Sequence, residues 1–211
     1  MERYAVADNS GTLAKVRETF QLVIDEKRNL FKDVSSIQPS ATLTTLLEEY
    51  TQLATAINTE KARSELLIMP VLTEVRRQLN YRISLFSGTD FDVDSSKGLN
   101  GFCDFILSGS EEQFYIKAPV MTIVEAKNEN IKGGLGQCIA TMIAAQSFNQ
   151  NTQQEVKTIY GVVTSGTNWR FLMLEGLTAY IDIVEYYIND VEKIIGILLQ
   201  PFQTALLQAS L

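Results

Sequence analysis

The stretch Thr122-Ile-Val-Glu-Ala-Lys-Asn128 ends an apolar run with a carboxylate and an amine two residues apart. In an extended strand, side chains at positions i and i+2 point to the same face, so Glu125 and Lys127 should project together from the end of a strand. Upstream, Asp104 lies inside residues 99–107, a second apolar run typical of a strand. The sequence therefore predicts an acid on one strand and a Glu-x-Lys pair on the next.

These residue types suit a site that binds a divalent metal and activates water. Mg²⁺ prefers hard oxygen ligands, usually takes one or two protein carboxylates and keeps several waters. We expect Asp104 and Glu125 to be ligands for Mg²⁺ or Mn²⁺, with the backbone carbonyl of Ala126 as a third. Lys127 would orient the attacking water or stabilise the transition state. The alternative is a structural ion pair of Lys127 with Glu125 or Asp104, which any α/β protein can contain.

Two further polar residues are candidates for the same site. Glu65 falls on a predicted helical stripe of apolar residues, where a carboxylate needs a metal or a cation as partner. The other members of this stripe are Ala62, Ile68, Met69 and Leu72. Gln137 comes ten residues after Lys127, at the predicted start of the next helix, where its amide could face the same cleft. The alternatives are a glutamate that interacts with a helix dipole and an ordinary glutamine of a first helical turn.

Composition limits the chemistry that the chain can perform. It has 211 residues, of which 45% are hydrophobic, enough for one folded domain with an elaboration. Histidine is absent, which excludes Ser-His and Cys-His nucleophilic mechanisms and histidine-ligated zinc. The net charge of −7 disfavours unaided binding to a phosphate backbone. Binding to nucleic acid would therefore require a local basic patch or an oligomer.

Three further expectations concern the thiols, the membrane and the basic residues. Cys103 and Cys138 have no metal-ligand spacing and are expected to be buried free thiols. No apolar run approaches the roughly 20 residues needed to span a bilayer, and a signal peptide is not apparent, so we expect a cytoplasmic protein with no membrane partner. The basic residues expected to face phosphate are Arg76, Arg77, Arg82, Lys97, Lys127 and Lys132.

Apolar spacing predicts helices and strands in an order typical of an α/β or α+β sandwich, with a mixed sheet covered by helices. Helices are predicted over residues 13–31, 43–57, 60–80, 137–148 and 191–207, with interruptions at Pro70 and Pro201. Strands are predicted over residues 81–86, 101–107, 113–117, 120–126, 158–164, 169–174 and 179–184. The Gly133–Gly136 run is expected to be a flexible turn, and Trp169 a core residue.

Several landmarks in one order resemble the PD-(D/E)XK, or restriction-endonuclease-like, nuclease superfamily. They are Glu65 with Pro70-Val-Leu, Gly101-Phe-Cys-Asp104, Val124-Glu-Ala-Lys127, Gln137 and Gly161-Val-Val-Thr-Ser-Gly-Thr-Asn-Trp-Arg-Phe171. The last segment is similar to the Thr-x-Gly-x-x-Trp-x-Phe pattern of the nuclease parts of type I restriction subunits. The resemblance covers roughly residues 60–175, and Cys103 stands where the superfamily name has proline.

The resemblance implies a restriction-endonuclease-like αβββαβ core. It implies Asp104 and Glu125 as metal ligands, Lys127 as the catalytic lysine, and Glu65 and Gln137 as contributions from helices, with Glu65 close enough to act as a further metal ligand. We divide the chain into an N-terminal helical extension (1–58), the nuclease-like core (59–187) and a C-terminal helix (188–211) that packs on the core or on a partner.

The expected function is that of a Mg²⁺-dependent endonuclease that hydrolyses DNA, alone or through a partner subunit. A homo-oligomer, with a dimer favoured, follows from the apolar terminal helices and from the pairing of active sites in the superfamily. RNA is an open alternative to DNA. The competing class is a noncatalytic interaction or scaffold protein that has kept the nuclease fold, because fold alone does not establish function.

Overall fold

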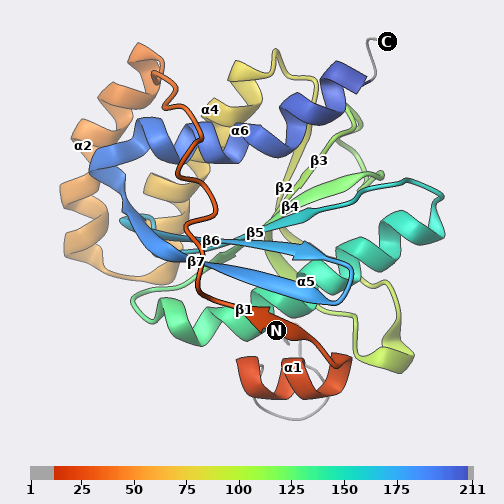
Figure 1. Cartoon of the computed structure of the whole chain (residues 1–211). Helices are drawn as coiled ribbons and strands as arrows, with labels where there is room; N and C mark the ends of the chain where they lie inside the picture. The colour runs from red at the N-terminus through yellow and green to blue at the C-terminus, as the bar shows by residue number, and fades with distance from the viewer. Residues whose placement is uncertain (1–11, 209–211) are drawn as a thin grey trace.

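Seven strands form one mixed sheet in the order β1-β7-β6-β5-β4-β3-β2 (Figure 1). The computed structural model describes residues 12–208, with side chains as far as Gln203. The strands are β1 (Val23–Asp25), β2 (Ser84–Asp90), β3 (Phe102–Ser108), β4 (Val120–Ala126), β5 (Ile159–Thr164), β6 (Asn168–Glu175) and β7 (Thr178–Tyr187). The expectation of a mixed sheet covered by helices is confirmed.

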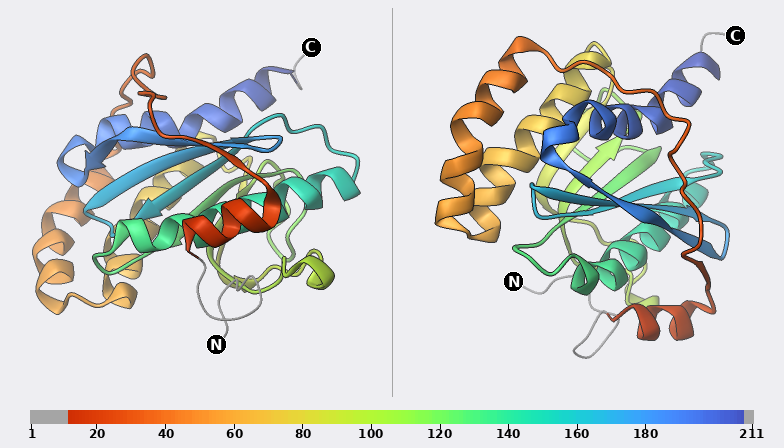
Figure 2. Two further views of the ribbon diagram at one scale, coloured as in Figure 1. Left: turned by 60° about the horizontal axis from the view of Figure 1, so that its bottom comes forward. Right: turned by 60° about the vertical axis from the view of Figure 1, so that its left-hand side comes forward.

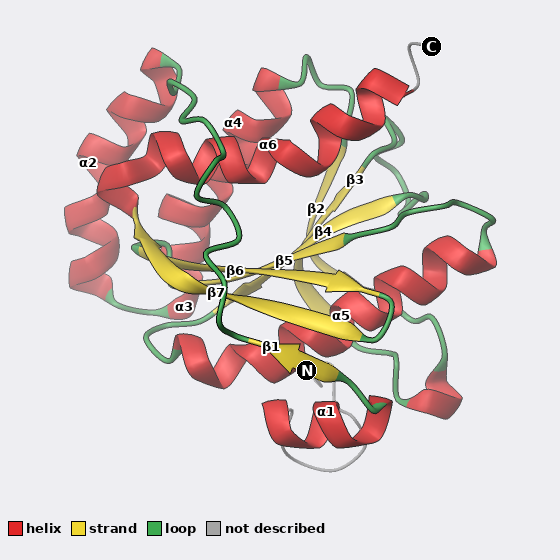
Figure 3. Ribbon diagram, in the orientation of Figure 1, coloured by secondary structure: helices red, strands yellow, loops and turns green. Residues whose placement is uncertain are grey.

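Helices cover both faces of this sheet (Figure 3). They are α1 (Leu13–Phe20), α2 (Ala41–Ile57), α3 (Glu60–Arg63), the π-helix η1 (Ser64–Ile68), α4 (Met69–Gln78), α5 (Ile131–Asn151) and α6 (Val191–Gln208). Two short 3₁₀ turns are η2 (Ser95–Lys97) and η3 (Ile188–Asp190). One apolar core lies between the sheet and the α1–α5 layer, and a second lies between the sheet and the α4–α6 layer (Figures 1 and 2).

The pairing of the strands creates a parallel step in the middle of the sheet. β2, β3 and β4 form an antiparallel meander, whereas β4 and β5 are parallel and are connected through α5. β5, β6 and β7 continue as an antiparallel meander, and β1 adds to β7 in parallel at the edge. The carboxyl ends of β4 and β5 therefore lie at the same edge of the sheet, the usual location of ligand sites in open α/β sheets.

The N-terminal region differs from the sequence expectation. The helix predicted over 13–31 ends at Phe20, where Gln21 adopts a left-handed conformation with φ of 52°, and the chain then forms β1. Residues 26–40 cross to α2 alongside β7 and α6, where the Ile183 amide donates to Arg28 O at 3.1 Å and the Ile37 amide to Glu192 O at 2.9 Å (Figure 2). Helical periodicity in residues 21–31 is misleading, because Leu22 and Ile24 pack in the core on the α1–α5 side of the sheet, whereas Leu30 and Phe31 pack in the core on the α4–α6 side.

Two other predicted elements are corrected. Residues 113–117 form no strand, because Gln113 uses its side-chain amide to bond the backbone of Leu85 at the edge strand β2, at 2.7 and 3.2 Å. α5 begins at Ile131 instead of residue 137, so the Gly133–Gly136 run is helical and the prediction of a flexible turn is wrong. Asn130 caps this helix through a bond from the Gly133 amide to its side-chain oxygen at 2.9 Å.

The helical segment before β2 changes its winding in front of Pro70. α3 leads into the π-helix η1, in which the Met69 amide bonds Ser64 O, and α4 then continues through Pro70. Proline has no amide hydrogen for an ordinary helical bond, and the π-turn lies directly before this break in the bonding pattern. The extra residue in this turn rotates the side chains that precede it relative to a regular helix.

The C-terminal helix packs on its own chain. Ile194, Ile195, Leu198 and Phe202 of α6 are buried in the core between α6 and the sheet. The apolar face of α6 is therefore covered by its own chain as far as Phe202, and the dimer, expected also from the N-terminal helices and from the superfamily, stays a prediction. Within residues 12–208, no helix is both long and apolar enough to cross a bilayer.

Candidate active site

Asp104 is fastened to the end of β4. The antiparallel register pairs Phe105 of β3 with Val124 of β4, which places Asp104 next to Glu125 at the point where this pairing ends. The Ala126 amide then donates to Asp104 Oδ2 at 2.8 Å. A side-chain carboxylate thus takes the place of a strand carbonyl, so the acid of the first strand is held against the Glu-x-Lys pair of the second.

Glu125 and Lys127 project to the same face, as their spacing predicts. The ammonium of Lys127 donates to Glu125 Oε1, and their side chains are 13% and 2% exposed. Lys127 Nζ also lies 3.5 Å from Gln137 Oε1. Asp104, Glu125, Lys127 and Gln137 are therefore brought to one place, and Gln137 reaches it from the second turn of α5.

A close approach between α5 and the sheet creates this arrangement. A Cβ on Gly134 would lie 2.6 Å from Val163 Cγ1 and 3.1 Å from both Cγ and Cε of Lys127. On the strand side, a Cβ on Gly161 would lie 2.3 Å from Met142 Sδ. Because each glycine presents only hydrogen, the helix lies close enough to the strands for the lysine stem to pass across its first turn.

Burial and the negative charge of the site raise the pKa values of the two cysteines. Burial, followed by the charges of Glu125 and Asp104, raises the pKa of the Cys103 thiol well above its ordinary value. Burial and then the charge of Glu125 also raise the pKa of Cys138. Both residues are buried free thiols, as predicted.

Glu65 does not lie in apolar surroundings, and that prediction is wrong. Its side chain is 62% exposed and forms an ion pair with Lys61 at 3.8 Å. The other stripe members Ala62, Ile68 and Leu72 are buried. Glu65 lies inside the π-helix η1, whose wider turn breaks the regular spacing on which the stripe was based. Glu65 is therefore not a buried carboxylate that needs a metal ion as its partner.

The donor set fits a hard divalent cation with a small protein contribution. Within residues 12–208, no cluster of three or more carboxylates or cysteines is arranged to hold a metal ion. Asp104 and Glu125 are two hard-oxygen donors on adjacent strands, and Mg²⁺ is commonly held by one or two carboxylates with water completing the octahedron. Ala126 is buried and its amide bonds Asp104, and its carbonyl as a third ligand stays a prediction.

Residues that the sequence reasoning did not single out surround the same sheet edge. Arg63 is buried there and bonds the turn between β5 and β6, and Asn58 bonds Glu129 beyond β4. Asn128 has a buried side-chain oxygen without a hydrogen-bond partner among the described residues. Of these residues, only Asn128 belongs to the stretch 122–128. The positions of Asn58 and Arg63 in the sequence do not indicate which residues they contact.

Trp169 is fully buried, as predicted, and donates from its indole to Gly166 O at 3.0 Å, which gives the segment 161–171 a structural role.

Comparison with known proteins assigns the chain to no family. We find no protein-family model and no curated protein that matches this chain.

Proposed function

We propose that this protein is a metal-dependent nuclease that hydrolyses phosphodiester bonds in DNA. The observation that carries the proposal is the Glu125–Lys127 pair on the α5 face at the end of β4, with Asp104 fastened beside it. The order α4-β2-β3-β4-α5-β5, with a meander followed by a parallel step, supports a restriction-endonuclease-like αβββαβ core. Buried acid–amine pairs are common in catalytic sites, and ligand sites of open α/β sheets commonly lie at the carboxyl ends of strands.

The proposed roles follow from the chemistry of each side chain. Asp104 and Glu125 would hold Mg²⁺ or Mn²⁺, which supplies Lewis acidity and lowers the pKa of a bound water. Lys127 offers ammonium hydrogens for orienting the nucleophilic water and for neutralising negative charge at the phosphoryl group. Gln137, whose amide oxygen lies 3.5 Å from that ammonium, limits its rotation.

Charge explains why a partner belongs to this proposal. At a net charge of −7 the chain repels a polyanion as a whole, so DNA would be held by local basic residues, a second copy or a basic partner subunit. We propose a cytoplasmic protein that acts as a homodimer or within a larger complex. A strong salt dependence of DNA binding is expected only where such basic groups are present.

The direct test measures cleavage of plasmid and single-stranded DNA with Mg²⁺ or Mn²⁺. Lys127→Ala should reduce the rate about 10²- to 10³-fold, because it removes a charge aimed at the transition state. Lys157→Ala is the matched control, since Lys157 is exposed and precedes β5, at the opposite edge of the sheet. Equal cleavage by the Lys127 and Lys157 variants would refute the catalytic assignment.

The second candidate is a noncatalytic interaction protein with the same fold. It is favoured by the acidic balance and by the ion pair itself, which can stabilise a fold without any chemistry. Calorimetry separates the two functions. If neither Mg²⁺ nor Mn²⁺ binds, and Lys127→Ala changes no nuclease activity, the interaction function replaces the enzymatic one.

A further inference from the structure

Arg63 is a buried cation at the edge of the sheet where Lys127 lies. It ends α3 and is 8% exposed. Its Nε donates to Asn58 Oδ1 at 3.0 Å, and its Nη1 donates to Ser165 O at 2.9 Å and to Thr167 Oγ1 at 3.1 Å. All three acceptors are neutral oxygens. Burying a guanidinium costs free energy, and these bonds offset part of that cost while tying α3 to the β5–β6 turn.

Asn58 extends this network to the segment after β4. It caps the C-terminus of α2 in a left-handed conformation, with φ of 53°. Its Oδ1 accepts from Arg63, and its Nδ2 donates to Glu129 Oε1 at 2.8 Å. The planar amide therefore links a buried cation to a carboxylate two residues beyond Lys127. The unfavourable isolation of the Arg63 charge is reduced through this bridge.

The network contacts the backbone of residues 127–129 at two places. On one side, the Lys127 amide donates to Thr164 O at 2.8 Å, and Thr164 directly precedes Ser165, whose carbonyl accepts from Arg63. On the other side, Glu129 is held by Asn58. The backbone is thus held at the Lys127 amide and at Glu129, and these two contacts connect to Arg63 through Ser165 and Asn58.

We propose that Arg63 and Asn58 are positioning residues that set the location of Lys127. They hold residues 127–129 against the β5–β6 turn, so the ammonium stays opposite Glu125 and Gln137. Neither residue contacts the reacting atoms. Arginine suits this position because its fork reaches several acceptors at once, whereas lysine is a point charge. The effect on cleavage rests on the proposed function, but the effect on the backbone of Lys127 does not.

The test breaks one hydrogen bond and then restores it in the opposite direction. Asn58→Asp keeps an acceptor for Arg63 and tolerates the left-handed backbone, but it turns a carboxylate toward that of Glu129. The double variant Asn58→Asp with Glu129→Gln restores a donor and an acceptor in the opposite direction. Thr55→Ala is the control on α2, because the Thr55 hydroxyl bonds to carbonyls of its own helix at 2.7 and 3.0 Å.

Two measurements are made on each full-length variant, the steady-state cleavage kinetics and the hydrogen exchange of the Lys127 amide. In Asn58→Asp we expect kcat to fall about 10- to 100-fold with KM nearly unchanged, since small misplacements of a catalytic group cost rate more than binding. Lys127 amide exchange should accelerate while the melting temperature is retained. The double variant should recover both properties, and Thr55→Ala should match the wild type.

Some outcomes would overturn the inference. It fails if Asn58→Asp leaves both kcat and Lys127 exchange at wild-type values, or if the double variant is as impaired as the single one. Should wild-type protein cut no DNA with either metal, the proposed nuclease function fails separately. The exchange of the Lys127 amide in the single and double variants then still decides whether the bond between Asn58 and Glu129 positions this residue.

Discussion

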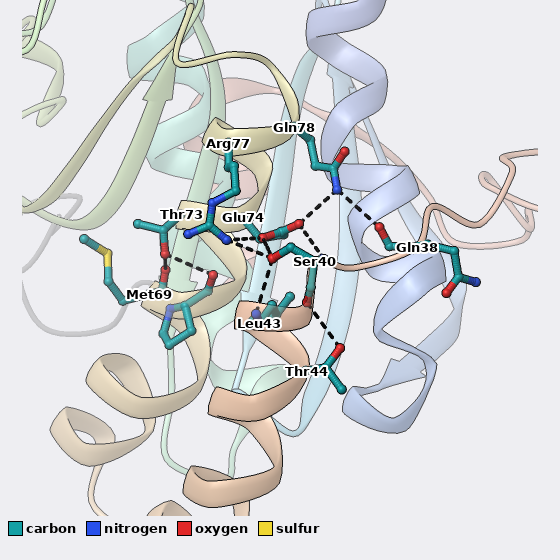
Figure 4. Close-up of polar contacts among 10 residues, drawn as sticks. Gln38, Ser40, Leu43, Thr44, Met69, Thr73, Glu74, Arg77 and Gln78 are labelled. Atoms are coloured by element: carbon teal, nitrogen blue, oxygen red, sulfur yellow. Dashed lines mark hydrogen bonds and ion pairs between the residues drawn. The ribbon is translucent and has the colours of Figure 1, made fainter.

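Glu74 and Glu125 are two almost fully buried carboxylates with very different surroundings. Glu74, on α4, is 1% exposed, and Glu125, on β4, is 2% exposed. Glu74 accepts from Ser40 N at 2.9 Å, Ser40 Oγ at 2.7 Å, Arg77 Nη1 at 2.8 Å and Gln78 Nε2 at 2.9 Å (Figure 4). Both of its oxygens are used, and its partners come from α4 itself and from the residue that caps α2.

Glu125 instead lies near an amine, an amide and a second carboxylate. Its cationic partner is Lys127, which also approaches Gln137, and Asp104 lies on the neighbouring strand. These groups come from two strands and a helix and meet where β4 ends. A buried charge is therefore no sign of function by itself. What distinguishes the two regions is that the Glu74 network joins one helix to the start of another, whereas the Glu125 group brings two acids, an amine and an amide together at the carboxyl end of β4.

The largest expected effect comes from exchanging the two carboxylates for amides. Glu125→Gln should lower nuclease activity about 10²- to 10³-fold, since it removes a metal ligand and a lysine partner. The free energy of unfolding should change by less than about 1 kcal/mol, because relief of the repulsion between Glu125 and the neighbouring Asp104 offsets the loss of the ion pair with Lys127. Cleavage assays and urea unfolding on the same sample measure both. Full activity in Glu125→Gln would remove the distinction between the two regions.

Glu74→Gln should show the reverse pattern. Its loss leaves Arg77 and the cap of α2 without a charged partner, and we expect a destabilisation of about 2–3 kcal/mol, reduced from that of a fully buried pair because Arg77 is 40% exposed. DNA cleavage measured well below the melting temperature should stay within about twofold of wild type, since a change remote from the reacting groups leaves transition-state stabilisation intact. A stable but inactive Glu74→Gln would place Glu74 in the site instead.

Acid should weaken the Glu74 network. Burial raises the pKa of Glu74, but the hydrogen bonds from Ser40 and Gln78 and the charge of Arg77 outweigh it, so the pKa falls below its ordinary value of 4.5. A lowered folded-state pKa gives stability that is present above 4.5 and is lost as pH falls through the folded value. The stability difference between wild type and Glu74→Gln should therefore shrink in urea titrations below that pH. A difference that grows on acidification would contradict this sign.

The smallest effect expected concerns the spacing of helix and strand. In Gly134→Ala the new methyl group meets Val163 and the stem of Lys127, and we expect about 1 kcal/mol of destabilisation with a several-fold loss of activity. Gly196→Ala serves as comparison on the α6 side, because its Cβ would lie 2.1 Å from Ser35 O. It should destabilise the fold with no specific loss of cleavage. Equal activity losses in the two variants would show that Gly134 has no special relation to Lys127.

Local patterns predicted much of the fold. Alternation and apolar runs located β3, β4, β5 and β6 to within a few residues, because these strands are short, bounded by turn residues and buried. The same reasoning failed for β1 and for residues 113–117, where an edge strand and a side-chain amide bond decide the structure. It also failed at Gly133–Gly136, where helix packing on β5 outweighs the low helix propensity of glycine.

The candidate site was predictable only in part. Glu125 and Lys127 share a face because they are two residues apart on one strand, and Gln137 was correctly associated with them. Glu65 was misplaced, since a π-turn before Pro70 changes the helical phase that the prediction assumed. Arg77, expected to face phosphate, bonds Glu74 and Ser40. The three-residue spacing of Glu74 and Arg77 on a predicted helix is a local signal for their ion pair, but the sequence carries no signal for the bond to Ser40, which is 37 residues away.

By itself, the sequence determined the available chemistry and the local geometry. The absence of histidine, the acid and amine spacing of β4 and the positions of the central strands follow from residue types and from short-range periodicity. The tertiary structure alone decided that Asp104 meets the Ala126 amide across 22 residues and that Arg63 meets Ser165 across 102. Those contacts depend on strand register and on the path of a crossover helix, which are set by packing of the whole chain and leave no periodic trace in the sequence.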